Sequence, residues 1–138
     1  MAEALILDAE AVNALARSTE RGVLAERARA ILEVAYERHA LVRVPSAVLA
    51  ELYRGSRADA AIDHLLAGRG ISVCDLTKDI ARRAGGLLAK AKVSSSHAVD
   101  AFVVATALEF DVAVIATGDP SDIRRMATSY RQLRVLAL

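Results

Sequence analysis

The sequence predicts a domain of the α/β class, built on a central and mostly parallel sheet. Two observations favour this class. Short runs suited to β-strands alternate with longer stretches suited to helices, which is the order that βαβ units produce. The composition is 54% apolar but only 4% aromatic, which describes a core of Ala, Val, Leu and Ile. A chain of 138 residues has room for one such core, so we expect residues 1–138 to form a single domain.

The expected strands are short apolar runs rich in Val, Ile and Leu, which suit the pleated surface of a sheet. Longer stretches suited to helices separate them, as crossovers between parallel strands require. The strands are expected at Ala4–Leu7, Leu41–Val44, Ile71–Val73, Val112–Ile115 and Leu133–Leu136.

The helical predictions rest on apolar periodicity and on residues that start or end helices. Residues 22–36 carry an apolar stripe at three- and four-residue spacing, interrupted only by Arg27, and their opposite face is charged. Pro45 favours the first turn of a helix that runs to about Arg54. Further helices are expected over 58–67, from His97 or Ala98 to Phe110, and after the Gly-Asp-Pro-Ser-Asp turn at 118–122.

One more helix is expected from Thr77, a suitable N-cap residue, to Lys90. Its interior contains the pair Gly85-Gly86, and glycine costs about 1 kcal/mol relative to alanine inside a helix. The pair therefore predicts either a close approach of another backbone or a kink.

Charge and cysteine content exclude several classes of protein. Eighteen basic and seventeen acidic residues leave a net charge of +1, so any patch for nucleic acid or membrane must be local. The single cysteine, Cys74, excludes an internal disulfide framework, and the three histidines have no spacing typical of a zinc site. No apolar run reaches the roughly 18 residues that span a bilayer, and the amino-terminal segment has no signal-peptide pattern. We expect a cytoplasmic protein without membrane partners.

Four carboxylates follow or interrupt apolar runs, where a charge is costly to bury. They are Asp8, Glu51, Asp100 and Asp119. A carboxylate in an apolar interior costs several kcal/mol unless a partner compensates its charge. Four such placements predict a shared partner, and a divalent cation is the simplest one.

Each acid taken alone has an alternative explanation in local structure. Asp8 suits a helix N-cap, Glu51 suits an ion pair with Arg54 three residues later, and Asp119 suits a turn. Asp100 is harder to explain, because a helix dipole contributes about 0.3 to 1 kcal/mol and does not offset burial among Val and Phe side chains.

Taken together, the four acids are expected to converge. Ligands of open α/β sheets bind at the carboxyl ends of strands, where Asp8 and Asp119 lie, and early helical turns supply Glu51 and Asp100. Without a cation these groups would repel and raise one another's pKa, whereas Mg2+ or Mn2+ takes oxygen ligands and retains water. Such a site suits hydrolysis of a phosphodiester by a metal-activated water.

Several other residues are candidates for contacts with a polyanionic substrate. His97 lies one turn before Asp100 and suits a hydrogen bond to that carboxylate or to a phosphate. For the arginines, ordinary solvated surface charge is the simpler alternative. The arginines closest to the acids in sequence are Arg54, Arg57, Arg124 and Arg125.

At these residues the chain resembles the PIN-domain ribonucleases, in particular the toxins of bacterial VapBC-type toxin–antitoxin systems. The matching motifs occur in family order over nearly the whole chain. They are Leu-Ile-Leu-Asp-Ala at 5–9, Val-Pro-Ser-Ala-Val-Leu-Ala-Glu-Leu at 44–52, His-Ala-Val-Asp-Ala-Phe-Val-Val-Ala-Thr-Ala at 97–107, and Ile-Ala-Thr-Gly-Asp-Pro-Ser-Asp at 115–122.

The resemblance implies a three-layer α/β/α domain that cleaves RNA with Mg2+ or Mn2+. It assigns Asp8, Glu51, Asp100 and Asp119 as the metal-binding acids. It also implies Thr117 as a hydroxyl that orients a carboxylate, and Asp122 as an outer acid or a helix-terminal residue. The family further implies a homodimer and a cognate antitoxin whose carboxyl-terminal segment covers the active site.

One departure concerns the position after the first acid, where many PIN domains carry Ser or Thr and this chain has Ala9-Glu10. Either that hydroxyl is missing or Thr117 serves instead. Two alternative functions stay open: a PIN fold that binds RNA without cleaving it, and a receiver-like phosphoacceptor domain in which Asp75 imitates the phosphorylated residue.

Overall fold

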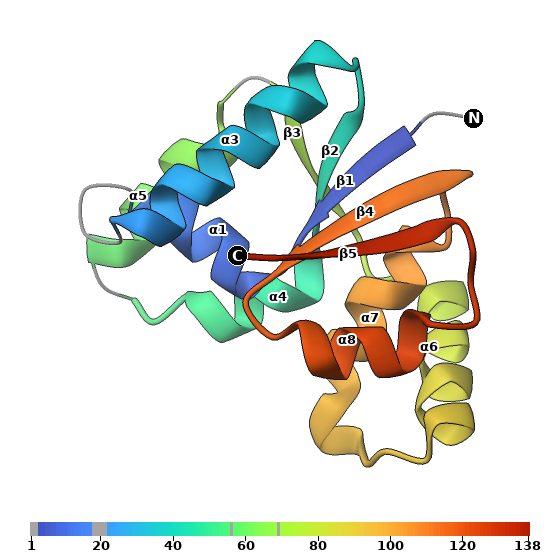
Figure 1. The fold of residues 1–138 in the computed structure, drawn as a ribbon. Helices are drawn as coiled ribbons and strands as arrows, with labels where there is room; N and C mark the ends of the chain where they lie inside the picture. Colours follow the sequence, from blue (N-terminus) through green and yellow to red (C-terminus); the bar gives the residue numbers. More distant parts are fainter. Residues whose placement is uncertain (1–2, 18–21, 56, 69) are drawn as a thin grey trace.

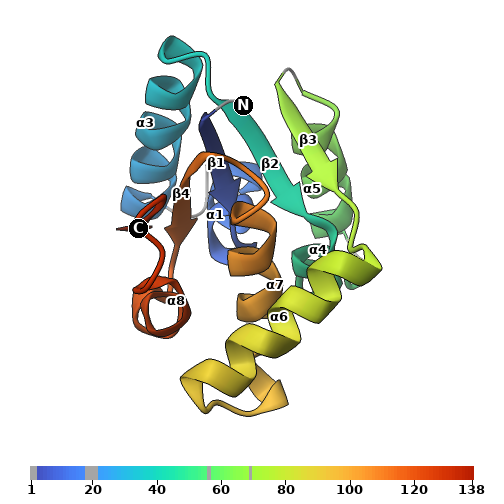
Figure 2. The same cartoon turned by 90° about the vertical axis from the view of Figure 1, so that its right-hand side faces the viewer.

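The computed structural model describes residues 3–17, 22–55, 57–68 and 70–138. Within them a five-stranded sheet carries helices on both faces (Figures 1 and 2). The strands are β1 (Glu3–Leu7), β2 (Leu41–Pro45), β3 (Ile71–Cys74), β4 (Val112–Thr117) and β5 (Leu133–Ala137). The helices are α1 (Ala9–Ala16), α3 (Val23–Glu37), α4 (Ser46–Leu52), α5 (Arg57–Leu66), α6 (Lys78–Ala91), α7 (Ala98–Ala107) and α8 (Pro120–Ala127), with a 3-10 turn η1 (Ser95–His97).

The three-layer α/β/α prediction is confirmed. Helices α1, α3 and α5 pack together on one face of the sheet, and α6, α7 and α8 pack together on the other. The strand pairs are all parallel within the described residues, so the sheet is parallel throughout rather than mostly parallel. Helical crossovers on both faces are what bury such a sheet.

The order of strands across the sheet is β3-β2-β1-β4-β5. The chain moves outward from β1 through β2 to β3, and then returns to β4 on the other side of β1. Strands β1 and β4 are direct neighbours, with Leu7 opposite Ala116. After these two strands the chain turns to opposite faces, into α1 and into α8. Such a reversal opens a crevice at the carboxyl ends of the strands.

Helix α7 forms the centre of one helical layer and is apolar almost all round. Ala101 and the five residues 103–107 are buried. The Thr106 hydroxyl, which is polar, donates to the Phe102 carbonyl at 2.7 Å and is thereby satisfied. A helix of this kind is held firmly by its surroundings, so Asp100 in its first turn has a fixed place.

The five predicted strands are confirmed, each with slightly wider bounds, and two helices end earlier than predicted. Helix α7 ends at Ala107, because the N–H groups of Glu109 and Phe110 turn back to carbonyls three residues earlier. Helix α4 ends at Leu52, because the N–H groups of Arg54 and Gly55 bond the Asp59 carboxylate at 2.9 and 2.8 Å. Pro45 ends β2 and is the N-cap of α4 rather than part of its first turn.

Two more predictions concern the Gly85-Gly86 pair of α6 and the absence of membrane-spanning segments. The close approach of another backbone to Gly85-Gly86, one of the two alternatives predicted, is wrong, since a Cβ atom at either residue would meet nothing within 4 Å. Within the described residues, no helix has both the length and the apolar character needed to cross a bilayer.

The N-cap predicted at Thr77 is confirmed, because its hydroxyl accepts from the Ile80 N–H at 3.1 Å. We expect Thr77→Ala to lower the free energy of unfolding by about 1 kcal/mol, the usual loss for such a cap. Urea unfolding monitored by circular dichroism measures this change. Thr77→Ser keeps the hydroxyl and is the matched control, so equal losses in the two variants would contradict the capping role.

Candidate metal centre

Asp8 begins the site at the point where β1 ends and α1 starts. Its Oδ1 accepts from the Ala11 N–H at 2.9 Å, so it is the N-cap of α1, and its Oδ2 accepts from the Gly118 N–H at 3.2 Å. The carboxylate also has a hydrogen bond with the Thr117 side chain. Burial raises the pKa of Asp8, and these three hydrogen bonds oppose the rise. The prediction that Asp8 is a helix N-cap is therefore confirmed, and the same carboxylate lines the crevice.

Thr117 links the first acid to the last. It ends β4, its side chain is fully buried, and its Oγ1 accepts from the Asp119 N–H at 2.9 Å. With the bond to Asp8, one hydroxyl fixes both acid-bearing loops at the sheet edge. Because the hydroxyl donates to one group and accepts from another, the loops keep a fixed relative position.

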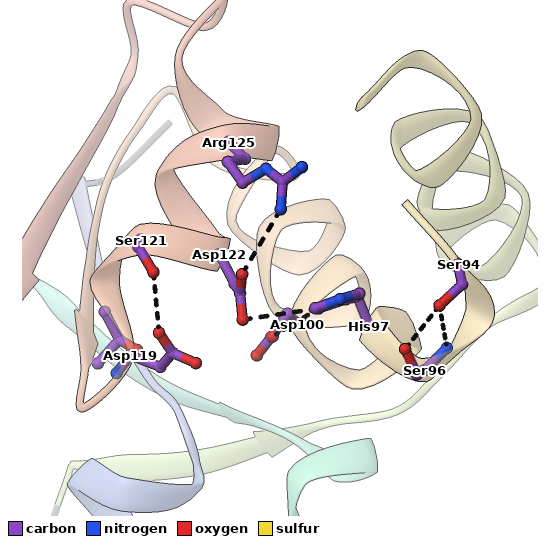
Figure 3. Close-up of polar contacts among 9 residues, drawn as sticks. Ser94, Ser96, His97, Asp100, Asp119, Ser121, Asp122 and Arg125 are labelled. Carbon is purple, nitrogen blue, oxygen red and sulfur yellow. Dashed lines mark hydrogen bonds and ion pairs between the residues drawn. The ribbon is translucent and has the colours of Figure 1, made fainter. Parts of the chain in front are cut away.

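Asp119 occupies the N-cap position of α8, but its side chain makes no capping hydrogen bond. Its Oδ1 instead accepts from the Ser121 hydroxyl at 3.3 Å, as Figure 3 shows. Gly118 allows the tight approach before it, because a Cβ at this position would overlap the Glu10 side chain. The carboxylate of Asp119 is exposed and lines the crevice.

Asp100 shows most directly that the acids influence one another. Its pKa is raised to about 6, first by burial and then by the negative charges of Asp122, Asp119, Asp8 and Glu51. A carboxyl group ionises less readily when desolvated and when like charges lie nearby. Residues spread from the first strand to the last helix therefore lie within electrostatic reach of one carboxyl group.

Glu51 stands near the end of α4, and its side chain is exposed. The ion pair expected with Arg54 is wrong, since none joins the two in the described part of the chain. The Arg54 guanidinium donates instead to the carbonyls of Ala50 and Tyr53, at 2.9 and 2.7 Å. Glu51 is thus left to line the crevice beside the other acids.

The four sequence-predicted acids line one pocket of about 410 Å³. Its complete lining is Asp8, Ala9, Glu10, Leu24, Glu51, Asp100, Gly118, Asp119 and Leu138. A larger cavity of about 460 Å³ lies beside α3 and contains none of these acids. The smaller pocket is therefore the candidate metal centre, because it gathers the four acids.

Asp122 and His97 lie beside Asp100, outside the pocket lining itself. The His97 Nδ1 is 3.6 Å from the Asp122 Oδ2 and 4.0 Å from the Asp100 Oδ2 (Figure 3). Asp122 also lies 4.0 Å from Arg125. One ligand atom from each of His97, Asp100 and Asp122 falls within 4.8 Å of the others.

Sequence reasoning did not find Glu10, Leu24 and Leu138 among the pocket residues. Glu10 follows the first acid-bearing turn, and Gly118 was the available signal, because its missing side chain accommodates Glu10. Leu138 is held by a hydrogen bond from its N–H to the Thr117 carbonyl at 3.0 Å. That contact depends on the pairing of β4 with β5 and has no signature in the local sequence.

The four arginines singled out from the sequence lie outside the pocket lining. Arg54 is occupied with carbonyl groups at the end of α4, and Arg57 begins α5. Arg124 and Arg125 are exposed in the last turn of α8, one to two turns from Asp119. Their positions are compatible with contacts to a substrate that extends beyond the pocket.

The residues present fit a divalent metal ion. The pocket lining gathers the carboxylates of Asp8, Glu10, Glu51, Asp100 and Asp119, and among the described residues that line it there is no Lys or Arg. Carboxylate oxygens are the ligands that Mg2+ and Mn2+ prefer. A cation would also remove the mutual repulsion that raises the pKa of Asp100.

The fold and the site together define a class of protein, namely a parallel three-layer α/β domain with an acidic centre at the reversal of strand order. The PIN domain family model matches residues 5–128, and the chain belongs to that family. The matched range includes each acid named above. Asp75 lies outside the pocket lining, so the receiver-like alternative is rejected.

Solved structures show the same fold at low sequence identity. The structure of VapBC2 from Rickettsia felis, bound to a DNA fragment from its promoter, matches with 14% identity and a TM-score of 0.68, covering 97% of this chain and 98% of that one. A toxin–antitoxin complex from Klebsiella pneumoniae matches with 17% identity and a TM-score of 0.65, covering 94% of each chain. VapBC-1 from nontypeable Haemophilus influenzae matches with 18% identity and a TM-score of 0.64, covering 97% of each.

A search of curated proteins finds no significant match to this chain.

The raised pKa of Asp100 makes the stability of the metal-free protein depend on pH. In the folded chain this carboxyl group titrates at about 6, whereas its ordinary pKa is 3.8. Between these values the folded chain binds more protons than the unfolded chain, so a rise in pH lowers the free energy of unfolding. The loss is complete above the folded pKa, and Asp100→Asn removes it because an amide does not ionise.

We therefore expect parent and Asp100→Asn to be similarly stable at about pH 4, and the variant to be the more stable at about pH 7. Urea unfolding in EDTA across this range measures the difference. Asp79 is an exposed acid in the first turn of α6, so Asp79→Asn is the matched control and should show no such trend. A stability difference between parent and Asp100→Asn that stays constant with pH would contradict the shared acidic site.

Proposed function

We propose that this chain is a Mg2+- or Mn2+-dependent endoribonuclease and the toxin of a toxin–antitoxin pair. The observation that carries the proposal is the convergence of Asp8, Glu51, Asp100 and Asp119 on one pocket of a PIN domain. The acids come from four separated segments of the chain, and a metal ion is the partner that their arrangement suits best.

The residues have distinct tasks in this proposal. Asp8, Glu51, Asp100 and Asp119 hold the cation, which when bound supplies a Lewis acid and lowers the pKa of water. Thr117 positions Asp8 by a hydrogen bond, with the N–H groups of Ala11 and Gly118. Such fixed ligands favour catalysis, because they need little rearrangement as charge develops at phosphorus.

The acids also act on the scissile phosphate indirectly. Asp100 stands on a buried helix, and Asp8 follows a buried strand and is held by hydrogen bonds, so the backbones of both acids have fixed positions. Glu51 is exposed on α4 and lines the same pocket. Asp122 is proposed as an outer acid of the centre, which its proximity to Asp100 supports.

An RNA substrate needs positive charge outside an acidic pocket. Arg54, Arg57, Arg124 and Arg125 are exposed and are the proposed contacts to its backbone. Arg124 and Arg125 lie in the last turn of α8, the helix that follows Asp119, so an RNA strand leaving the pocket along α8 would meet them. Such contacts fix the position of the RNA and carry no sequence information themselves.

The proposed partners are a cognate antitoxin and a second copy of this chain. Support for the antitoxin comes from the matched structures, which are toxin–antitoxin complexes from three bacteria, and the homodimer rests on resemblance to PIN toxins. Such a pair would act in the cytoplasm, where RNA is made and translated. The alternative of a PIN fold that binds RNA without cleaving it is decided by the assay below.

We expect the purified protein to cleave RNA in the presence of Mg2+ or Mn2+ and to stop when EDTA is added. Because an activated water attacks phosphorus, the products should carry 5'-phosphate and 3'-hydroxyl ends. Ligation-based mapping of the ends measures this, with Asp100→Asn as the inactive variant and Asp79→Asn as the active control. Products with 2',3'-cyclic phosphate ends would exclude this mechanism, and binding without cleavage would favour the non-catalytic alternative.

We also expect expression in bacteria to arrest growth through the same acids. Asp8→Asn, Glu51→Gln and Asp100→Asn each remove one ligand charge, so each should relieve the arrest at equal protein abundance. Growth curves with immunoblots measure both quantities together. If Asp100→Asn stayed as toxic as the parent, Asp100 would not belong to the metal centre.

A further inference from the structure

We propose that His97 is a ligand of the same metal centre, together with Asp100 and Asp122, and that it makes the centre prefer transition-metal dications to Mg2+. This inference rests on the proposed function, since it requires a divalent cation in the acidic pocket. It adds a nitrogen ligand to a centre whose other proposed ligands are carboxylate oxygens.

The local structure around His97 fixes the position of its backbone. The Ser94 hydroxyl accepts from the Ser96 N–H at 3.4 Å and contacts the Ser96 hydroxyl at 2.6 Å, which stabilises η1 (Figure 3). The His97 N–H donates to the Ser94 carbonyl at 3.1 Å. His97 is also the residue before α7, a helix anchored in the core. A short 3-10 turn and a buried helix thus fix it from both sides.

Among the described residues, no hydrogen bond of the usual length holds the His97 imidazole in its position. His97 occupies the N-cap position of α7, yet its side chain makes no capping hydrogen bond. Its Nδ1 lies 3.6 Å from the Asp122 Oδ2 and 4.0 Å from the Asp100 Oδ2, beyond the usual 2.7 to 3.2 Å of a hydrogen bond. The imidazole is therefore close to both carboxylates without being bonded to either.

These separations suit ligands of a common cation. Metal–ligand bonds of about 2.1 Å place adjacent ligands about 3.0 Å apart and opposite ligands about 4.2 Å apart. The two N···O distances lie between these values. The side chains of His97 and Asp100 are 29% exposed and that of Asp122 is 24% exposed, so an ion can reach them from solvent.

A simple ion pair between protonated His97 and the acids is the competing explanation, and it predicts the opposite result. In an ion pair the imidazolium competes with any metal ion for Asp100 and Asp122. Its removal would then leave metal affinity unchanged or increase it. If His97 is a ligand, its removal lowers metal affinity.

The ligand type also determines which metals are affected. Mg2+ takes oxygen ligands and retains its waters, whereas imidazole suits transition-metal ions, and affinity rises from Mn2+ to Co2+. Loss of the His97 nitrogen should therefore weaken Co2+ binding far more than Mg2+ binding. The order expected for the parent is Co2+ tightest, then Mn2+, then Mg2+.

The experiment titrates Co2+ and Mg2+ separately into parent, His97→Ala, His97→Asn and His64→Ala, using calorimetry and the visible absorption of Co2+. His64 is an exposed histidine on α5 outside the pocket lining and is the matched control. We expect both His97 variants to bind Co2+ at least about tenfold more weakly and with an altered spectrum, as loss of metal-site interactions typically costs 10- to 100-fold. Mg2+ affinity should change by less than about threefold.

The outcomes separate this inference from the proposed function. Unchanged Co2+ affinity and spectrum in both His97 variants, or tighter Co2+ binding, would overturn the role of His97 while leaving the acidic metal centre intact. If the parent bound neither Co2+ nor Mg2+, the proposed metal-dependent function itself would fail. Circular dichroism melts show whether each variant is folded, and His97→Asn decides the question if His97→Ala is not.

Discussion

The candidate centre depends on the parallel pairing of β1 with β4. That pairing sets Leu7 opposite Ala116, so the loops that follow the two strands begin side by side. Asp8 and Asp119 are separated by more than a hundred residues in sequence, and this register brings them to one crevice. The Thr117 hydroxyl then fixes one loop to the other. Without the neighbouring register the acids would have no common pocket, and Asp100 would lose the nearby negative charges that add to the effect of burial in raising its pKa.

Like charges held together must be opposed by other interactions, and the structure shows where those interactions are. Asp8 receives two backbone N–H groups and a hydroxyl, and Asp100 begins a helix whose remaining residues are core. Packing therefore positions Asp100, whereas hydrogen bonds position Asp8. The cap explanation and the metal-ligand explanation of Asp8 are compatible, because a carboxylate has two oxygens and spare lone pairs.

Much of the fold could be predicted from the sequence, because apolar runs and cap residues act locally. The five strands and the N-cap at Thr77 are of this kind. What could not be predicted depends on contacts between distant segments. Asp59, which lies on the later helix α5, ends α4 early because its carboxylate accepts from the N–H groups that follow α4. The proximity of His97 to Asp122 on α8 likewise depends on the tertiary fold. The four acids were found because a charge next to an apolar run is unusual, a signal that the arginines do not give. The burial expected from that signal holds for Asp8 and in part for Asp100, whereas Glu51 and Asp119 are exposed.

The position of Asp100 on α7 affects the stability of the whole fold. Since this helix is part of the core, repulsion at its first turn is not confined to a loop that can relax, and it is borne by the global fold. In the proposed function, a bound cation relieves this repulsion and so stabilises the fold as a whole. The acids of the proposed centre lower the stability of the protein when no cation is bound, which is the trade-off between stability and function typical of functional sites.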